Sequence, residues 1–216
     1  MYLDHVAQMG ILKVLLFKPL ARFVDLNITG LPTNHFTFHL QHLIEKGIIE
    51  KVDNLYRLTP MGLEISSRLD VKNLEFVHQP KLGVSICVTK KDQILLGRRL
   101  KNPNIGEAGF FAEKIRFNES IYDTAKRCLL KETGLTGDFI WCGEIHLTSQ
   151  VTDVVFTCFK VTNPQGVLET KTLESENFWV SLSKIKSVPK LFPDFPKHLS
   201  LFLSSKPFFE EITIEG

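Results

Sequence analysis

The residues best suited to chemistry lie between Gly106 and Leu135. Glu119, Arg127 and Glu132 fall in or beside a stretch that predicts a helix over about residues 120–133, and Gly134 would cap its end. Carboxylate oxygens such as those of Glu119 and Glu132 are the hard ligands that magnesium prefers. A bound magnesium ion can neutralise phosphate charge during transfer. These residue types therefore indicate phosphate chemistry assisted by a metal ion.

Their spacing resembles the signature box of Nudix hydrolases, Gx5Ex7REUxEExGU, where U is a bulky apolar residue. Counting back from Gly134-Leu135 puts Glu132, Arg127 and Glu119 at the family's positions. Residues 97–115 resemble the segment that precedes the box in this family. The resemblance implies an α/β/α sandwich around a mixed sheet. It also implies hydrolysis of a nucleoside diphosphate linked to another group, with Mg or Mn as cofactor.

The box departs from the family pattern at residues that should bind metal. Lys131 and Cys128 stand where the family has two of its three helix glutamates, and Glu113 replaces the first glycine. A lysine ammonium ~4 Å from a divalent ion costs roughly 8 kcal/mol at an effective dielectric of ~20. Cys128 offers soft sulfur instead of hard oxygen. We therefore expect a catalytically impaired domain without a cofactor, in which Glu119 and Glu132 would hold Mg or Mn only if it is active.

Positive side chains near the box suggest another use of the site. We predict that four of them bind the phosphate groups of a ligand directly: Arg98, Arg99, Arg116 and Lys131. Structural roles remain open for each candidate. Glu119 and Arg127 would pair to hold the loop to the helix, Cys128 would be a small apolar residue, and Lys131 a surface residue. Arg98 and Arg99 would solubilise a strand end.

The elements that must position this site come from residues 81–205. Alternating apolar residues predict strands over 81–89, 93–97, 141–149, 154–161 and 175–182. Residues 163–166 should form a turn, and residues 191–203 resemble the family's closing helix. On the box helix, the packing residues should be Tyr122, Ala125, Leu129 and Leu130. We treat residues 206–216 as a C-terminal tail.

The first 72 residues have a different pattern. Helices are predicted over 7–17, 21–26 and about 31–46, followed by a hairpin over 48–59 and a helix over 60–69. This order resembles a winged helix-turn-helix of the MarR or ArsR type, so we expect a mainly α domain over residues 1–72. Residues 73–80 would link it to the Nudix-like domain.

In winged helices the third helix enters the major groove and the wing touches the DNA backbone. Residues 1–72 carry eight Lys or Arg and seven Asp or Glu, so the charge that would attract DNA is small. Winged helices also serve in dimerisation or protein docking, which stays an alternative. The spacing of the third-helix histidines could suit zinc, but no acid sits in the position of an HExxH motif and no cysteine lies nearby, so a solvated polar face is favoured. The predicted DNA-binding residues are Thr33, Asn34, His35, His39, His42, Lys46, Lys51 and Arg57.

Net charge, cysteine spacing and apolar runs indicate the cellular compartment of the protein. The net charge of +2 does not by itself predict a polyanion partner. The four cysteines are far apart, which argues against a zinc knuckle or disulfide framework and fits a reducing cytoplasm. The apolar run 14–17 is too short to cross a membrane. We expect a cytoplasmic protein with no membrane partner.

Three functions remain open. The favoured one is a regulator, a homodimer by analogy, that binds DNA and senses a nucleotide or phosphorylated small molecule. The second is an active Nudix hydrolase in which Glu107, Glu113 or Glu144 replaces a missing metal ligand. The third is a protein–protein scaffold that keeps only the two folds.

Overall fold

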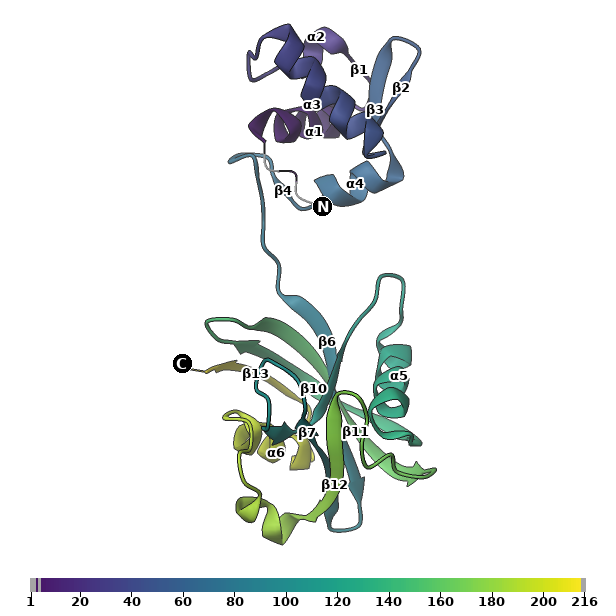
Figure 1. The fold of residues 1–216 in the computed structure, drawn as a ribbon, viewed down its shortest axis with the longest axis vertical. Coiled ribbons are helices and arrows are strands. Elements are labelled where there is room, and N and C mark those ends of the chain that lie inside the picture. Colours follow the sequence, from purple (N-terminus) through teal and green to yellow (C-terminus); the bar gives the residue numbers. More distant parts are fainter. Residues whose placement is uncertain (1–2, 4, 215–216) are drawn as a thin grey trace. The chain divides into compact units, whose positions relative to one another are not determined.

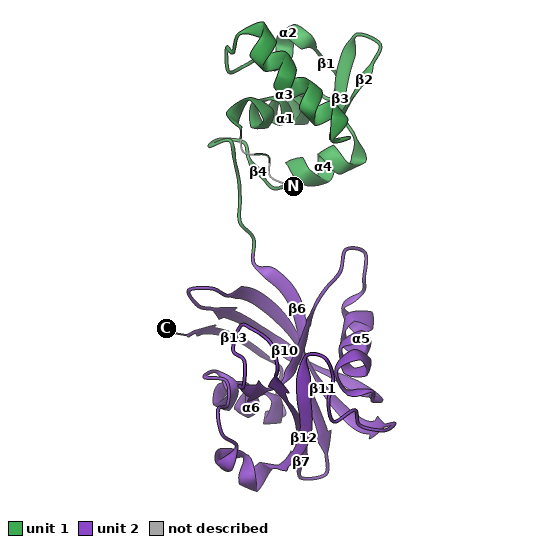
Figure 2. Cartoon of the chain, viewed as in Figure 1, with its two compact units in different colours: residues 1–79 green, residues 80–216 purple. Residues whose placement is uncertain are grey.

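The computed structural model describes residues 3 and 5–214. The chain divides into two compact units, residues 1–79 and residues 80–216 (Figure 1, Figure 2). The division falls at the end of the linker that the sequence predicts. No helix among the described residues is long and apolar enough to cross a membrane.

The first unit is helical with a small sheet. The third helix buries Phe36, Leu40 and Leu43, which share one face at helical spacing, against Leu12 and Leu15 of the first helix. Three short strands form an antiparallel sheet in the order β1-β3-β2. The elements are α1 (Val6–Phe17), β1 (Ala21–Arg22), α2 (Phe23–Leu26), α3 (Thr33–Glu45), β2 (Ile49–Val52), β3 (Leu55–Leu58), α4 (Pro60–Ser66), β4 (Leu69–Asp70) and β5 (Glu75–Phe76).

Two segments of this unit differ from the sequence prediction. Residues 21–26 are not one helix, because Ala21 and Arg22 pair with β3 as a strand before α2 begins. The last helix ends at Ser66, and the chain then forms the β4–β5 hairpin. Part of the predicted linker therefore packs on the first unit, with Leu74 and Phe76 against its core.

The second unit is built on a mixed sheet with the strand order β12-β7-β6-β11-β10-β13, with β8 beside β7 and β9 beside β6. The pair β6–β11 is parallel and the pair β10–β11 is antiparallel. The strands are β6 (Lys81–Lys90), β7 (Gln93–Arg99), β8 (Ala108–Gly109), β9 (Phe111–Lys114), β10 (Thr136–Thr148), β11 (Asp153–Gln165), β12 (Ser175–Ser181) and β13 (Phe208–Thr213). The helices are α5 (Ile121–Thr133), the 3-10 turn η1 (Leu182–Ser187) and α6 (Phe195–Leu203).

Alternation along the central strands creates two hydrophobic cores. Side chains of β6 alternate between the faces of the sheet, so Val84, Ile86 and Val88 lie in one core and Cys87 in the other. Helix α5 packs on the first core and α6 on the second (Figure 1). The expected α/β/α sandwich with a mixed sheet is therefore confirmed.

The C-terminal residues belong to this sheet. Residues 208–213, predicted to lie in a tail, form β13 and pair in parallel with β10. The packing of Phe208 and Ile212 against the α6 core explains the difference. Strand β11 also runs through the predicted turn at residues 163–166, because its pairing with β10 continues to Gln165.

Candidate active site

Helix α5 positions most of the site. The Ser120 hydroxyl accepts a hydrogen bond from the Asp123 amide at the start of the helix, and Gly134 ends it with φ 70°. Ala125, Cys128 and Leu129 are buried against the sheet. Of the other predicted packing residues, Leu130 is exposed. Tyr122 is about half exposed, but its ring packs edge-on against Phe159 at 5.2 Å and Phe139 at 6.4 Å.

Glu119 and Arg127 form a bidentate ion pair. The Arg127 Nε donates to Glu119 Oε1 and its Nη2 donates to Glu119 Oε2, both at 2.7 Å. The backbone amide of Arg116 donates to the same carboxylate at 3.1 Å. The hydrogen bonds from Arg127 lower the pKa of Glu119 to about 2. Both oxygens are thus engaged in holding the loop to the helix, which is the structural role that the sequence left open.

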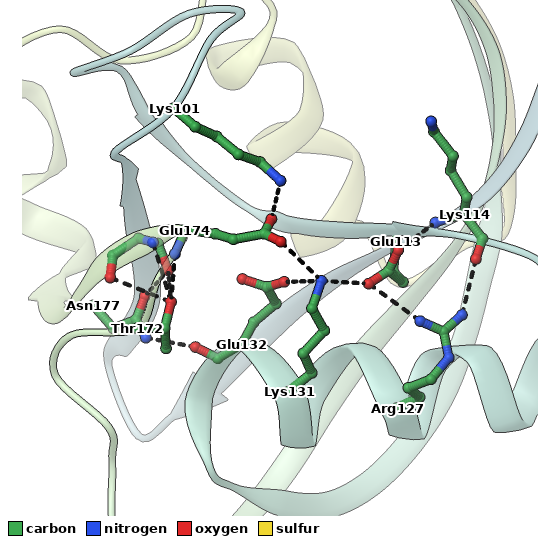
Figure 3. Close-up of polar contacts among 10 residues, drawn as sticks. Lys101, Glu113, Lys114, Arg127, Lys131, Glu132, Thr172, Glu174 and Asn177 are labelled. Carbon is green, nitrogen blue, oxygen red and sulfur yellow. Dashed lines mark hydrogen bonds and ion pairs between the residues drawn. The ribbon is translucent and has the colours of Figure 1, made fainter.

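Lys131 lies among three carboxylates (Figure 3). Its Nζ is 2.9 Å from Glu113 Oε2, 3.1 Å from Glu132 Oε1 and 3.2 Å from Glu174 Oε1. These residues come from β9, from α5 and from the loop before β12. The hydrogen bond with Glu113 contributes most to raising the pKa of Lys131. The ammonium group therefore carries its charge at neutral pH, and we call Lys131 and these three glutamates the Lys131 cluster.

Two backbone contacts hold the cluster in place. The Asn177 side-chain amide donates to the carbonyl of Glu132 at 2.6 Å, which anchors the end of α5 to β12. The carbonyl of Glu174 accepts from the Leu100 amide at 2.9 Å. Lys101 also pairs with the Glu174 carboxylate, and this hydrogen bond contributes most to lowering the pKa of Glu174. The cluster is therefore supported from two segments, residues 100–101 and β12.

The site does not fit the divalent metal that Nudix hydrolases generally use. The carboxylate of Glu119 is bonded to Arg127, and the Lys131 ammonium lies beside that of Glu132. Cys128 is fully buried, and burial raises the pKa of its thiol, so it offers no thiolate. Among residues 3 and 5–214, no three His, Cys, Asp or Glu side chains are arranged to hold a metal ion.

The four predicted phosphate-binding cations have different surroundings. Arg98 donates to the carbonyls of Gly106 and Pro189, so it ties loops together rather than facing a ligand. Lys131 is held by the carboxylates of its cluster and is not a free anion-binding group. Arg99 lines a cavity, and Arg116 is exposed.

The cavity has a volume of about 490 Å³, within the range of small-molecule sites. Its wall combines polar side chains with several phenylalanines. Glu132 and Glu174 place the Lys131 cluster at this wall. The sequence analysis did not predict several of its polar residues. Among them, the spacing of four residues between Asp194 and His198 could have indicated a side-chain pair on one helix face. The missed residues are Lys101, Glu174, Asp194 and His198.

The predicted DNA-binding residues lie on α3 and on the β2–β3 hairpin. Thr33, Asn34 and His35 are exposed in the first turn of α3. His39 is half-buried and stacks on His5, with ring centroids 3.7 Å apart, which removes it from the exposed face. His42 is also half-buried.

The basic residues predicted near the wing are all exposed. Lys46 follows α3, and Lys51 lies on β2 with its Nζ 5.8 Å from the Tyr56 ring centroid. Arg57 pairs with Glu50 at 2.7 Å, which neutralises part of the positive charge expected there.

Comparison with known proteins identifies the second unit. The family model described as the NUDIX domain matches residues 79–202. The MutT protein of Bacillus halodurans is 20% identical, with a TM-score of 0.55, over 62% of this chain and 90% of that chain. The MutT NUDIX hydrolase of Burkholderia pseudomallei is 17% identical, with a TM-score of 0.53, over 57% and 98%.

The NUDIX domain of Shewanella oneidensis NrtR, solved with ADP ribose, is 17% identical, with a TM-score of 0.46, over 67% of this chain and 96% of that chain. No curated protein matches the chain. At these identities the solved structures share the fold alone. The family model covers more than half of the chain, and its range contains the box residues Glu119, Arg127 and Glu132. The chain therefore belongs to the Nudix family.

Proposed function

We propose that the Nudix domain binds a nucleotide or phosphorylated metabolite without hydrolysing it, and that this ligand controls DNA binding by residues 1–79. The observation that carries the proposal is the Lys131 cluster. A positive charge within 3.2 Å of Glu113, Glu132 and Glu174 repels the divalent cation that hydrolysis needs. The domain retains a cavity for a small molecule beside these residues.

Two basic side chains at the cavity support a phosphorylated ligand, although four acidic side chains line it as well. Arg99 and Lys101 both line it. The Lys101 ammonium pairs with Glu174 alone among the described acids, so two of its three N–H donors remain for phosphate oxygens, whereas Lys131 pairs with three carboxylates. Arg99 uses its Nε to bond the Pro103 carbonyl, which leaves its other donors for a ligand. Arg116 is a further candidate on the exposed loop.

A metal-free binding experiment tests this part. We expect ADP-ribose or another nucleotide to raise the melting temperature equally in EDTA and in magnesium buffer. Chromatography of the same mixtures should show no product. Arg99→Gln should weaken binding, whereas Lys91→Gln, an exposed lysine in the β6–β7 turn, should not. Failure of every phosphorylated compound to stabilise the protein would refute the proposal.

The first unit is proposed to be a winged helix-turn-helix that binds DNA as a homodimer. The order α1, α2, α3 and a β2–β3 hairpin supports this, as do the exposed Asn34 and His35 on α3. Fluorescence anisotropy with DNA from upstream of its own gene should show binding at low salt that changes when nucleotide is added. Asn34→Ala should weaken binding and Glu45→Gln should not. Light scattering would test the dimer.

One observation favours the hydrolase alternative. Glu113 and Glu174 lie beside Glu132 around one point, although neither is a glutamate of the box. Release of phosphate or nucleotide in manganese buffer, abolished by Glu132→Gln, would establish it and contradict the regulatory proposal.

A further inference from the structure

The cavity contains two acceptor atoms that lack a hydrogen-bond partner among the described residues. They are Nε2 of His198 and Oε2 of Glu107, and both side-chain atoms are buried. Both residues line the same cavity. A buried polar atom without a partner destabilises the protein, so native structures satisfy most such atoms with protein, water or ligand. These two atoms are therefore available to a molecule that enters the cavity.

His198 is built into the wall as a fixed acceptor. The residue is 6% exposed, and its Nδ1 lies 2.8 Å from Oδ2 of Asp194, one turn earlier. A carboxylate only accepts, so in the neutral ring the proton resides on Nδ1 and Nε2 is an acceptor. Asp194 thus fixes both the tautomer and the orientation of the ring. A ligand that binds to Nε2 must supply a donor.

Backbone hydrogen bonds hold Glu107 in a second chain segment that lines the cavity. Its carbonyl accepts from the Arg99 amide at 2.9 Å, and its own amide donates to the Asn104 carbonyl at 3.1 Å. The neighbouring Ala108 accepts from the Phe192 amide at 3.0 Å, which brings this segment beside the start of α6. The cavity wall therefore presents two acceptors from distant parts of the sequence.

The rest of the wall favours a flat apolar ring. Phe110, Phe111, Phe192 and Phe195 all line the cavity. Phe110 and Phe195 stack with ring centroids 4.8 Å apart, which fixes their orientation. A planar heterocycle can pack on such rings while its N–H groups satisfy the acceptors.

We infer that His198 and Glu107 select an amino-bearing nucleobase, whose exocyclic N–H donates to these buried acceptors while Arg99 and Lys101 bind its phosphate. The inference rests on the proposed function, since it names the part of the nucleotide that this cavity reads. It assigns a specificity role to the Asp194–His198 pair, in which Asp194 is a positioning residue. An ordered water molecule would satisfy the same atoms without conferring any base preference.

Binding of four compounds to the full-length protein tests the inference. The affinities of AMP, GMP, IMP and ribose 5-phosphate would be measured by calorimetry in EDTA buffer. IMP lacks the amino group of either purine, so AMP or GMP should bind about 10-fold tighter or more than IMP. His198→Phe and Glu107→Gln should each reduce this preference. His146→Phe, a histidine on β10 paired with Asp153, is the matched control and should preserve it.

The outcomes separate the two proposals. Equal binding of AMP, GMP and IMP, or ribose 5-phosphate binding as tightly as all three, would overturn base selection while leaving phosphate-ligand binding intact. No binding of any of the four would overturn base selection, and failure of ADP-ribose to bind as well would count against the proposed function. If His198→Phe fails to fold by circular dichroism, Asp194→Asn provides a second variant that frees the ring, and retention of full base preference in it would also refute the inference.

Discussion

Replacing Lys131 with methionine would test whether its ammonium group occupies the position of a metal ion. The substitution keeps an unbranched chain but removes a charge that lies 2.9 to 3.2 Å from three carboxylate oxygens. Glu132 would then lose this cation, whereas Glu113 would keep Arg127 Nη1 at 3.1 Å and Glu174 would keep Lys101. We expect the variant to be less stable and to bind a divalent cation more tightly than the natural protein does.

The stability lost in Lys131→Met depends on how far solvent reaches the Lys131 side chain. The Lys131 side chain is 43% exposed, so each ion pair is typically worth only about 0.3–1 kcal/mol, and three together about 1–3 kcal/mol at low salt. That corresponds to a fall in melting temperature of roughly 3–10 °C for a domain of this size. Manganese at about 100 times its dissociation constant should restore about 2.7 kcal/mol.

The stabilisation contributed by Glu113 and Glu174 should decrease as the pH falls. Burial opposes the shift, but hydrogen bonding to Lys131 lowers the pKa of Glu113, and hydrogen bonding to Lys101 lowers that of Glu174. Their stabilisation is therefore full above the unfolded pKa, roughly 4.3. It is lost as the pH falls through the folded pKa values. The stability difference between the natural protein and Lys131→Met should therefore shrink in acid.

Calorimetric melting with and without manganese would measure these effects. Lys126→Met is the matched control. Lys126 is an exposed lysine on the same helix, and its ion pair among the described residues is with Asp123 at 3.6 Å. The reasoning would be refuted if Lys131→Met melted like the natural protein at low salt. Equal stabilisation of both by manganese would refute it as well.

Three further predictions concern the same unit. Arg127→Gln should destabilise the Nudix domain. The loss of stability should become smaller as the pH drops from about 4.5 to 2, because Arg127 lowers the pKa of Glu119 to about 2, and acid denaturation of both proteins would measure it. Native protein should react with a thiol reagent at Cys142 before the other three cysteines, because Cys87, Cys128 and Cys158 are buried; mass spectrometry before and after denaturation would count the modified thiols. A chain ending at Lys206 should lose about 3 kcal/mol in urea unfolding, because β13 contributes Phe208 and Ile212 to the α6 core, and unchanged stability would show that β13 is dispensable.

Local sequence patterns predicted much of the fold. The helix from Ser120 to Gly134 was predictable because its caps and its box residues depend on nearby residues. The strands of the central sheet were predictable from their apolar residues, although β10 and β11 extend beyond the expected ends. Pairing between two strands decides how far each continues, and no single strand encodes it.

Which residues meet at the site depended more on tertiary structure than on local sequence. The sequence alone determined that Lys131 and Cys128 replace acids in the box, and that Glu119 and Arg127 could pair. Only the folded chain decided that Glu113 and Glu174 surround Lys131, and that His198 shares a cavity with Glu107. Helical spacing acts over a few residues, whereas these contacts join segments brought together by the order of strands in the sheet.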